Sequence, residues 1–392
     1  MATPKLRFKE FDGDWINTKV KELGEFSSGG TPSKDIHDYW NGNIPWISSS
    51  DLNEESIFDI RINRFISEDA IKNSATKKIP KNSILLVSRV GVGKVALTNQ
   101  ELCTSQDFTA LTPKKDYALF IAYLMKNVTP RLLDLNQGTS IKGFVREDLI
   151  SLPISLPSKE EQTKIASFLS AVDEKISQLT QKHALLSQYK QGMMQKLFSQ
   201  QIRFKTDDGS EFGEWDINII RDVFTNKSKN FNPQNEGNLP CIELEHLSQN
   251  TGKILGTIES CEQQSTKNLF EKNSVLFGKL RPYLRKFAKP KFKGVCSSEI
   301  WVLTGIKVSN DYLFQYIQSE QFSELTNIQS GSKMPRADWG VISEAEIEYP
   351  CLAEQTKISN FLSAIDQKIE VVAQQIEQAK TWKKGLLQQM FV

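Results

Sequence analysis

Two stretches of the chain show the spacing of apolar residues that is typical of long helices. Between residues 165 and 197, and again between 358 and 390, apolar or tolerated residues recur in steps that alternate between three and four. This average spacing of about 3.5 is the pattern of a coiled coil. Pro157 and Pro350 stand just before the two stretches, where the chain is still extended. The pattern therefore predicts two long helices, 158–200 and 351–392.

These two predicted helices are copies of one sequence. EQTKIASFLSAVDEKI at 161–176 is matched by EQTKISNFLSAIDQKI at 354–369, which starts 354 − 161 = 193 residues later. Matches also occur outside the helices. They pair Arg7-Phe8-Lys9 with Arg203-Phe204-Lys205, Gly13-Asp14-Trp15 with Gly213-Glu214-Trp215, and Asn82-Ser83-Ile84-Leu85 with Asn273-Ser274-Val275-Leu276. The chain is therefore read as two copies of one plan, in which a diverged domain (1–157 and 201–350) precedes a similar helix.

The order of these parts predicts the topology. The first helix has to carry the chain from the first domain to the second, so packing of the two apolar stripes favours an antiparallel pair. The domains show short apolar runs, such as 84–87, 275–277 and 300–303, between turn-forming residues. The expected fold class is α+β. Two similar mixed α/β domains would be joined by two long antiparallel helices, with an approximate two-fold axis.

Composition narrows the class of protein. The chain has 392 residues, 39% of them hydrophobic and 24% charged, with a formal net charge of +2. This is a globular composition, and no apolar run approaches the ~18 residues of a membrane span. The five cysteines are scattered without a CxxC pair, so neither a zinc site nor a disulfide framework is predicted. We expect a cytoplasmic protein whose own chain holds no metal and no cofactor.

The near-neutral net charge conceals two basic runs. Residues 72–100 contain six Lys or Arg and no acid, and residues 279–293 contain seven and no acid. The two runs lie at corresponding places, since the first includes the residues just after Asn82-Ser83 and the second follows Asn273-Ser274. Such local basic faces are what binding to phosphates requires. Polar residues able to read base edges lie nearby. The candidate DNA-binding residues are Lys77, Lys78, Ser88, Arg89, Lys94, Ser105, Gln106, Thr139, Ser140, Lys142, Lys279, Arg281, Tyr283, Arg285, Lys286, Ser297, Ser298, Lys333 and Arg336.

At this point the sequence resembles the specificity subunits of type I restriction–modification systems. The resemblance is carried by GGTPS at 29–33, YWNGNIPWIS at 39–48, LFGKLRPY at 276–283 and the repeated helices. It implies that each domain recognises one half of a split double-stranded DNA site and that the helices set the spacer between the halves. It also implies docking of two copies of an adenine methyltransferase subunit, to which restriction subunits can be added. S-adenosylmethionine, ATP and Mg²⁺ would then belong to the partner subunits, and this chain would be non-catalytic.

Candidate partner-binding residues lie on the predicted helices at matched positions. They are Phe168, Lys175, Lys190, Phe198, Phe361, Lys368, Lys383 and Phe391.

One departure from the family pattern concerns the second domain, which has Asn230–Glu245 where the first has the GGTPS and IPW motifs. The two halves should therefore read different sequences, giving an asymmetric site. An enzyme is disfavoured, because no Pro-Pro-aromatic methyltransferase motif occurs and the residues around Gly91 and Lys94 do not match a phosphate-binding loop. The alternative is a non-catalytic coiled-coil scaffold that does not bind DNA. The salt dependence of DNA binding discriminates between the two.

Overall fold

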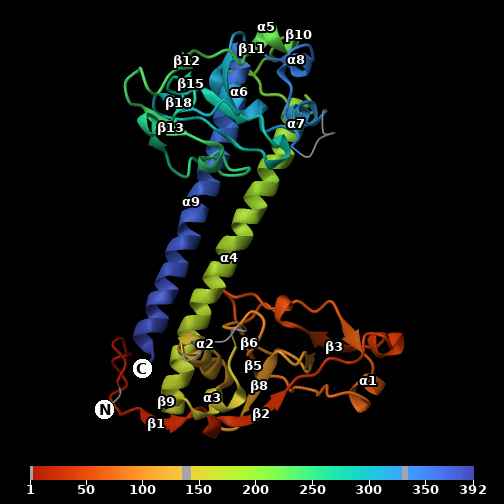
Figure 1. Ribbon diagram of the computed structural model, residues 1–392, viewed down its shortest axis with the longest axis vertical. Helices are drawn as coiled ribbons and strands as arrows, with labels where there is room; N and C mark the ends of the chain where they lie inside the picture. Colours follow the sequence, from red (N-terminus) through yellow and green to blue (C-terminus); the bar gives the residue numbers. More distant parts are fainter. Residues whose placement is uncertain (1–2, 135–142, 329–333) are drawn as a thin grey trace. The chain divides into compact units, whose positions relative to one another are not determined.

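The protein is described by a computed structural model that covers residues 3–134, 143–328 and 334–392 (Figure 1). The chain divides into two compact units. Unit 1 is formed by Met1–Gln181 together with Ala373–Val392, and unit 2 by Lys182–Val372. Unit 1 is therefore built from two segments that are far apart in the sequence. In the part of the chain that is described, no helix is long and apolar enough to cross a membrane.

The described residues of unit 1 form three small sheets. An antiparallel pair joins β1 (Ile16–Lys19) to β9 (Pro153–Leu156). A four-stranded sheet has the order β2 (Gly24–Ser28), β8 (Phe108–Pro113), β5 (Ile84–Val87), β6 (Val95–Leu97). A three-stranded sheet has the order β4 (Phe65–Ile66), β3 (Ile44–Ile47), β7 (Cys103–Thr104), and β3 is parallel to β7. The helices of this domain are α1 (Glu68–Lys72), α2 (Ala118–Asp134) and α3 (Arg146–Ser151).

Unit 2 repeats this plan, with a five-stranded sheet in place of the three-stranded one. β10 (Asp216–Ile219) pairs with β20 (Glu346–Tyr349), and the four-stranded sheet has the order β11 (Phe224–Thr225), β19 (Ile300–Gly305), β16 (Val275–Gly278), β17 (Phe287–Ala288). The remaining sheet has five strands, in the order β12 (Asn230–Phe231), β15 (Lys267–Phe270), β18 (Gly294–Cys296), β13 (Pro240–Ile242), β14 (Ile258–Glu259). The helices are α5 (Ile220–Val223), α6 (Asn310–Tyr316), α7 (Glu320–Asn327) and α8 (Trp339–Ile342).

The repeated Asn-Ser motif has a structural cause. Asn82 and Asn273 both have φ near 64°, in the left-handed region that asparagine tolerates better than most residues. Each stands in the turn before an inner strand of a four-stranded sheet, β5 or β16, whose residues are all buried. The motif therefore marks a tight turn into the core of each domain.

Both predicted long helices are present, as α4 (Lys159–Phe198) and α9 (Leu352–Met390). In unit 1, the first part of α4 (Ile165, Leu169) shares a core with the last part of α9 (Leu386, Met390). In unit 2 the halves are exchanged, so that the end of α4 (Leu197) shares a core with the beginning of α9, including Leu362. The two helices are therefore antiparallel within each unit, as predicted.

An N-terminal arm holds each domain on its helix. The guanidinium of Arg7 donates to both carboxylate oxygens of Glu161, at 2.8 and 2.7 Å, and the indole of Trp15 donates to the same group at 3.3 Å. Arg203 and Trp215 make the same bonds to Glu354, at 3.1, 2.7 and 3.3 Å. Both carboxylates are buried. The Arg, Trp and Glu of these repeated motifs thus recur because they bond to one another within each unit.

Candidate nucleic-acid interface

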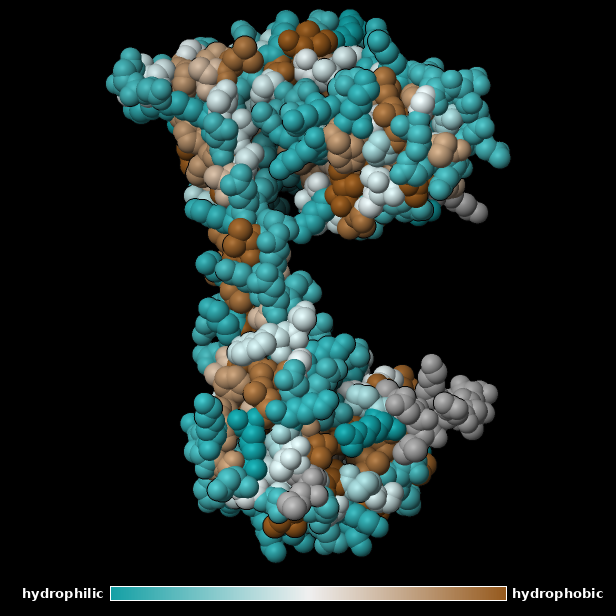
Figure 2. Space-filling view, turned by 90° about the vertical axis from the view of Figure 1, so that its left-hand side faces the viewer, coloured by the Kyte–Doolittle hydropathy of each residue, from teal (hydrophilic) through white to brown (hydrophobic). Residues whose placement is uncertain are grey.

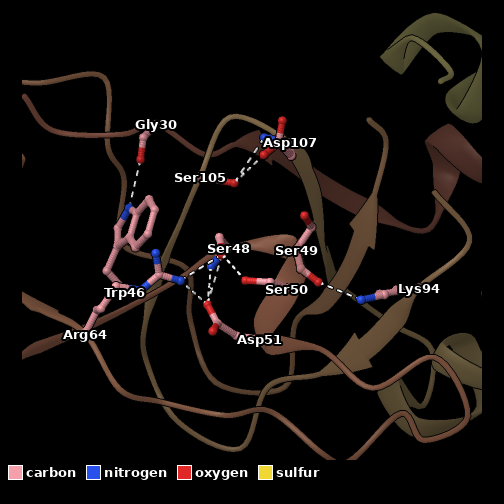
Figure 3. Close-up of polar contacts among 10 residues, drawn as sticks. All are labelled: Gly30, Trp46, Ser48, Ser49, Ser50, Asp51, Arg64, Lys94, Ser105 and Asp107. Atoms are coloured by element: carbon pink, nitrogen blue, oxygen red, sulfur yellow. Dashed lines mark hydrogen bonds and ion pairs between the residues drawn. The ribbon is translucent and has the colours of Figure 1, made fainter. Parts of the chain in front are cut away.

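The candidate site of unit 1 lies where the parallel strands β3 and β7 end (Figure 3). Three loops meet there. The amide of Ser105, after β7, donates to the Ile47 carbonyl at 2.9 Å, and the ammonium of Lys94 donates to the Ser49 carbonyl at 2.9 Å. The amide of Ser88, after β5, donates to the Asp107 carbonyl at 2.8 Å. The end of the basic run, Ser88 to Lys94, and the loop that contains Ser105 and Gln106 are therefore brought together beside the turn after β3.

The turn after β3 carries an organised cation. This turn is a 3₁₀ helix, η3 (Ser49–Asp51), and the Ser48 amide donates to the Asp51 carboxylate at 2.7 Å. The Arg64 guanidinium donates to the Ser48 hydroxyl at 2.7 Å and to Asp51, and it lies 4.6 Å from the Trp46 ring centroid. A guanidinium held by a carboxylate and by an aromatic face loses little further freedom when it binds a planar partner.

The two sequence motifs of the first domain build this frame. The Trp46 indole, from the IPW motif, donates to the Gly30 carbonyl at 2.9 Å, and the Thr76 hydroxyl donates to the same oxygen at 2.8 Å. A Cβ atom on Gly30 would lie 2.5 Å from the carbonyl carbon of Ala75, so only glycine fits there. GGTPS and IPW therefore position the turn that follows β3.

Unit 2 has the same backbone frame at the end of the parallel pair β13 and β18. The turn is η4 (Leu244–His246), in which the Glu243 amide donates to Nδ1 of His246 at 3.0 Å. The Lys286 ammonium donates to the Leu244 carbonyl at 2.6 Å, which is the bond that Lys94 makes in unit 1. The Ser297 amide donates to the Ile242 carbonyl at 3.0 Å.

The side chains on this second frame differ from those of the first. The Glu243 carboxylate accepts from the Lys267 ammonium at 2.6 Å, and the Lys267 side chain is only 4% exposed. Burial, with the nearby Glu243 carboxylate, raises the pKa of the Cys241 thiol to about 11. Sequence reasoning missed Arg64, Asp51, Glu243 and Lys267. Lone charged residues outside a basic run give no signal of this kind.

Exposed residues of the second basic loop gather beside this turn. Arg281 and Arg285 both have positive φ, 52° and 49°, and flank the short 3₁₀ helix η6 (Pro282–Leu284). The Arg281 amide donates to the Pro335 carbonyl at 2.8 Å, and the Arg336 guanidinium contacts Glu299 at 3.1 Å. A residue other than glycine in the left-handed region of φ and ψ is conformationally strained, and residues with such strain are often found at binding sites. Lys279, Arg281, Tyr283, Ser298 and Arg336 are thus brought together, with Tyr283 56% exposed.

Other predicted DNA contacts form the frame itself. Arg285 donates to the Ser323 hydroxyl at 2.8 Å and to the Gln318 carbonyl, and burial lowers its pKa. The hydroxyls of Ser88 and Ser105 are bonded to Asp107, and both residues are buried. With Lys94 and Lys286, these side chains are engaged internally, so their direct contact with DNA stays a prediction that the structure does not favour.

The remaining predicted DNA contacts are placed as follows. Lys77 and Arg89 are exposed, and Lys78 is paired with Glu68 at 2.6 Å. Gln106 is exposed and accepts from the Thr31 hydroxyl, whereas Ser297 is partly buried. Thr139, Ser140, Lys142 and Lys333 lie outside the described residues. Among the described residues, no group of His, Cys, Asp and Glu side chains could hold a metal ion.

Most candidate partner-binding residues face inward within their own unit. Phe198 and Phe391 are each 5% exposed. Phe168 contacts Phe8 and Trp382, and Phe361 contacts Phe204. Lys190 is paired with Asp366 at 2.7 Å and Lys383 with Asp173 at 2.5 Å. Lys175 and Lys368 are exposed.

Comparison with known proteins agrees with this repeated architecture. The chain is 27% identical to the type I restriction enzyme MjaIX specificity subunit of Methanocaldococcus jannaschii, over 97% of this chain and 94% of that protein. It is 31% identical to the EcoR124I/EcoR124II specificity subunit of Escherichia coli, over 45% of each chain. In fold it is similar to the S subunit of a type I restriction-modification system from M. genitalium, with a TM-score of 0.60 and 16% identity, over 100% of this chain and 99% of that one.

The match to the family model is itself double. The model of the type I restriction modification DNA specificity domain matches residues 12–188 and again residues 213–381. Each match includes one domain with its three-loop site and most of the long helix that follows. Two copies of the domain therefore account for most of the chain, and the protein belongs to the family of type I restriction–modification DNA specificity subunits.

Proposed function

We propose that this chain recognises a bipartite, asymmetric site in double-stranded DNA, with unit 1 reading one half and unit 2 the other. One observation carries the proposal. The same backbone frame of three loops, closed by Lys94 or Lys286, occurs in both units with different polar side chains on it. A shared frame with different side chains gives two readers of one design and two sequences.

The exposed charges of the site fit DNA. In unit 2, Arg281, Tyr283 and Arg336 are exposed and Lys279 is partly exposed, and in unit 1 Lys77 and Arg89 are exposed. Cationic side chains at such loops neutralise phosphates, and an exposed arginine can make a bidentate contact to guanine. Arg64 is bonded to Asp51 but keeps 39% of its side chain exposed, so it has this chemistry in unit 1. In unit 2 the Glu243 carboxylate, 23% exposed beside Lys267, can accept from the amino group of cytosine.

We also propose that the helices dock two copies of one modification subunit. Trp382 and Tyr189 occupy equivalent positions, 382 − 189 = 193 residues apart, and are 54% and 51% exposed. Lys175 and Lys368 are a second exposed pair with the same separation. Figure 2 shows hydrophobic residues on the surface of the helical segment. A solved relative with a TM-score of 0.58 comes from work on complex assembly of a type I system.

Catalysis then belongs to the partners. In this proposal, the modification and restriction subunits bind S-adenosylmethionine, ATP and Mg²⁺, and the present chain brings them to the DNA in the cytoplasm. The chain contributes sequence recognition and geometry, which require neither a nucleophile nor a metal.

The decisive experiment maps adenine methylation in cells that carry the modification partner, with and without this chain. We expect a split motif to become methylated only when the chain is present. A Lys279→Ala/Arg281→Ala variant should lose methylation and reduce the salt slope of DNA binding by about two, because each lost phosphate contact removes about one. Lys291→Ala, also exposed but outside the gathered set, is the matched control. If the chain changed no methylation although the modification subunit was folded and bound to it, the proposal would fail. The alternative of a coiled-coil scaffold that does not bind DNA would then be favoured.

A further inference from the structure

Each unit contains one ion pair between α4 and α9, at equivalent positions of the repeat. In unit 1 the Lys383 ammonium lies 2.5 Å from the Asp173 carboxylate, and the two side chains are 11% and 12% exposed. In unit 2 the Lys190 ammonium lies 2.7 Å from Asp366, with 11% and 38% exposure. Lys190 and Lys383 occupy the apolar stripe, where a hydrophobic residue is the usual occupant.

Each pair is also bonded to the domain that its unit contains. The Tyr123 hydroxyl, from α2, donates to Asp173 at 2.6 Å, and the Lys383 ammonium lies 6.0 Å from the Tyr123 ring centroid. In unit 2 Lys190 donates to the Gln318 side-chain oxygen at 2.8 Å, and Gln315 of α6 donates to Asp366 at 3.3 Å. The pairs therefore join both helices and one domain at a single point.

The apolar stripe alone does not select this register. Its residues recur in every heptad, so a slide of α9 by one heptad again brings apolar side chains against each other. Such a slide would place Ile376 or Met390 opposite Asp173, and Ala166 or Thr180 opposite Lys383. Both charges would then be buried without an opposite charge beside them, which is strongly destabilising. The ion pair therefore penalises the alternative register more than it stabilises the native one.

We propose that Lys383–Asp173 and Lys190–Asp366 are positioning pairs that fix one antiparallel register between α4 and α9 in each unit, and so limit the DNA spacer lengths that the chain accepts. The spacer part rests on the proposed function, whereas the register part does not. The pair of unit 1 is more buried and should have the larger effect.

The test replaces the pair of unit 1 in two ways. Asp173→Leu/Lys383→Met removes both charges, which at a buried pair often leaves stability unchanged or raised. Asp173→Lys/Lys383→Asp exchanges them and keeps a pair. A matched surface control is Lys164→Gln/Glu10→Gln, because that pair is half exposed at both ends. The readouts are binding to split sites whose spacer is shortened or lengthened by one base pair, and the distance between α4 and α9.

Wild-type chain should prefer the correct spacer by about tenfold or more, and the uncharged variant by about threefold or less. The exchanged and surface variants should keep the wild-type preference. Spin labels at Lys175→Cys and Gln378→Cys, both exposed positions of unit 1, report the register after Cys261 and Cys351 are replaced by serine. The uncharged variant should add a population displaced by about 10 Å, the length of one heptad.

A single label distance and an unchanged spacer preference in the uncharged variant would overturn the proposal. If the wild-type chain bound no split site at all, the proposed function would fail, and the spacer part with it. The label distances would still decide whether the pair fixes the register.

Discussion

Unit 1 and unit 2 end their parallel strand pairs in the same way and then present opposite charges. In unit 1 the turn holds the Arg64 guanidinium over Trp46, and in unit 2 the turn holds the Glu243 carboxylate on the buried Lys267 ammonium. The lysine bonds that close the two frames are the same. The two units therefore share a backbone frame and one lysine that closes it, and they differ in the side chains that this frame displays.

The largest effect is expected from breaking the ion pair that holds each domain on its long helix, and it tests whether this pair contributes equally in the two units. Arg7→Ala and Arg203→Ala should each lower the free energy of unfolding by about 3 kcal/mol, because each leaves a buried glutamate without its cation. Urea unfolding of both variants measures this. Lys164→Ala, which breaks an exposed pair, is the control and should change little. If the two variants lost very different amounts of stability, the Arg7–Glu161 and Arg203–Glu354 pairs would not be equivalent.

The next effect should be confined to unit 2. Lys267→Met leaves the partly buried Glu243 carboxylate without its ammonium partner and should cost about 2 kcal/mol of stability. It should also alter base preference in one half of the site while leaving the other half unchanged. Competition between duplexes with one half scrambled measures this, with Lys291→Met as the exposed control. A change of preference in both halves would contradict one reader per unit.

A smaller effect should occur in both units. Lys94→Met and Lys286→Met each remove a charge-assisted bond to a turn carbonyl, worth about 1.5 kcal/mol. Each should weaken binding at its own half-site only, because the turn is loosened and no phosphate contact is lost. The slope of binding against salt should therefore stay unchanged. A slope reduced by about one would mean that the lysine contacts phosphate.

The smallest effect should be the same in both units. Asn82→Ala and Asn273→Ala should each cost about 1 kcal/mol, because alanine resists the left-handed backbone of this turn. Glycine at the same positions should be nearly neutral, and it is the matched control. Thermal unfolding of the four variants is sufficient. If alanine left the stability unchanged at only one of the two positions, the two turns would not be equivalent.

The helices and the doubling of the domain could be predicted because they depend on local periodicity and on direct comparison of the chain with itself. The inward orientation of Lys190 and Lys383 could not, because a charged residue in an apolar stripe suits a partner as well as a buried carboxylate. Arg285 and Lys286 belong to a run of cations, and a run does not show which of its members points inward. Arg64 and Lys267 depend on neighbours that only the folded sheets bring close.

Unit 1 is assembled from both ends of the chain, and this has a consequence for synthesis on the ribosome. Unit 2 is one continuous segment and can close as soon as it has emerged, whereas unit 1 needs Ala373–Val392 to complete its core. Its N-terminal portion must wait for roughly 190 further residues, which takes about 10–40 s at ordinary rates of translation. During that interval the apolar face of α4 that later meets Leu386 and Met390 is uncovered. Of the two units, the one whose translation starts first is thus the last to be finished.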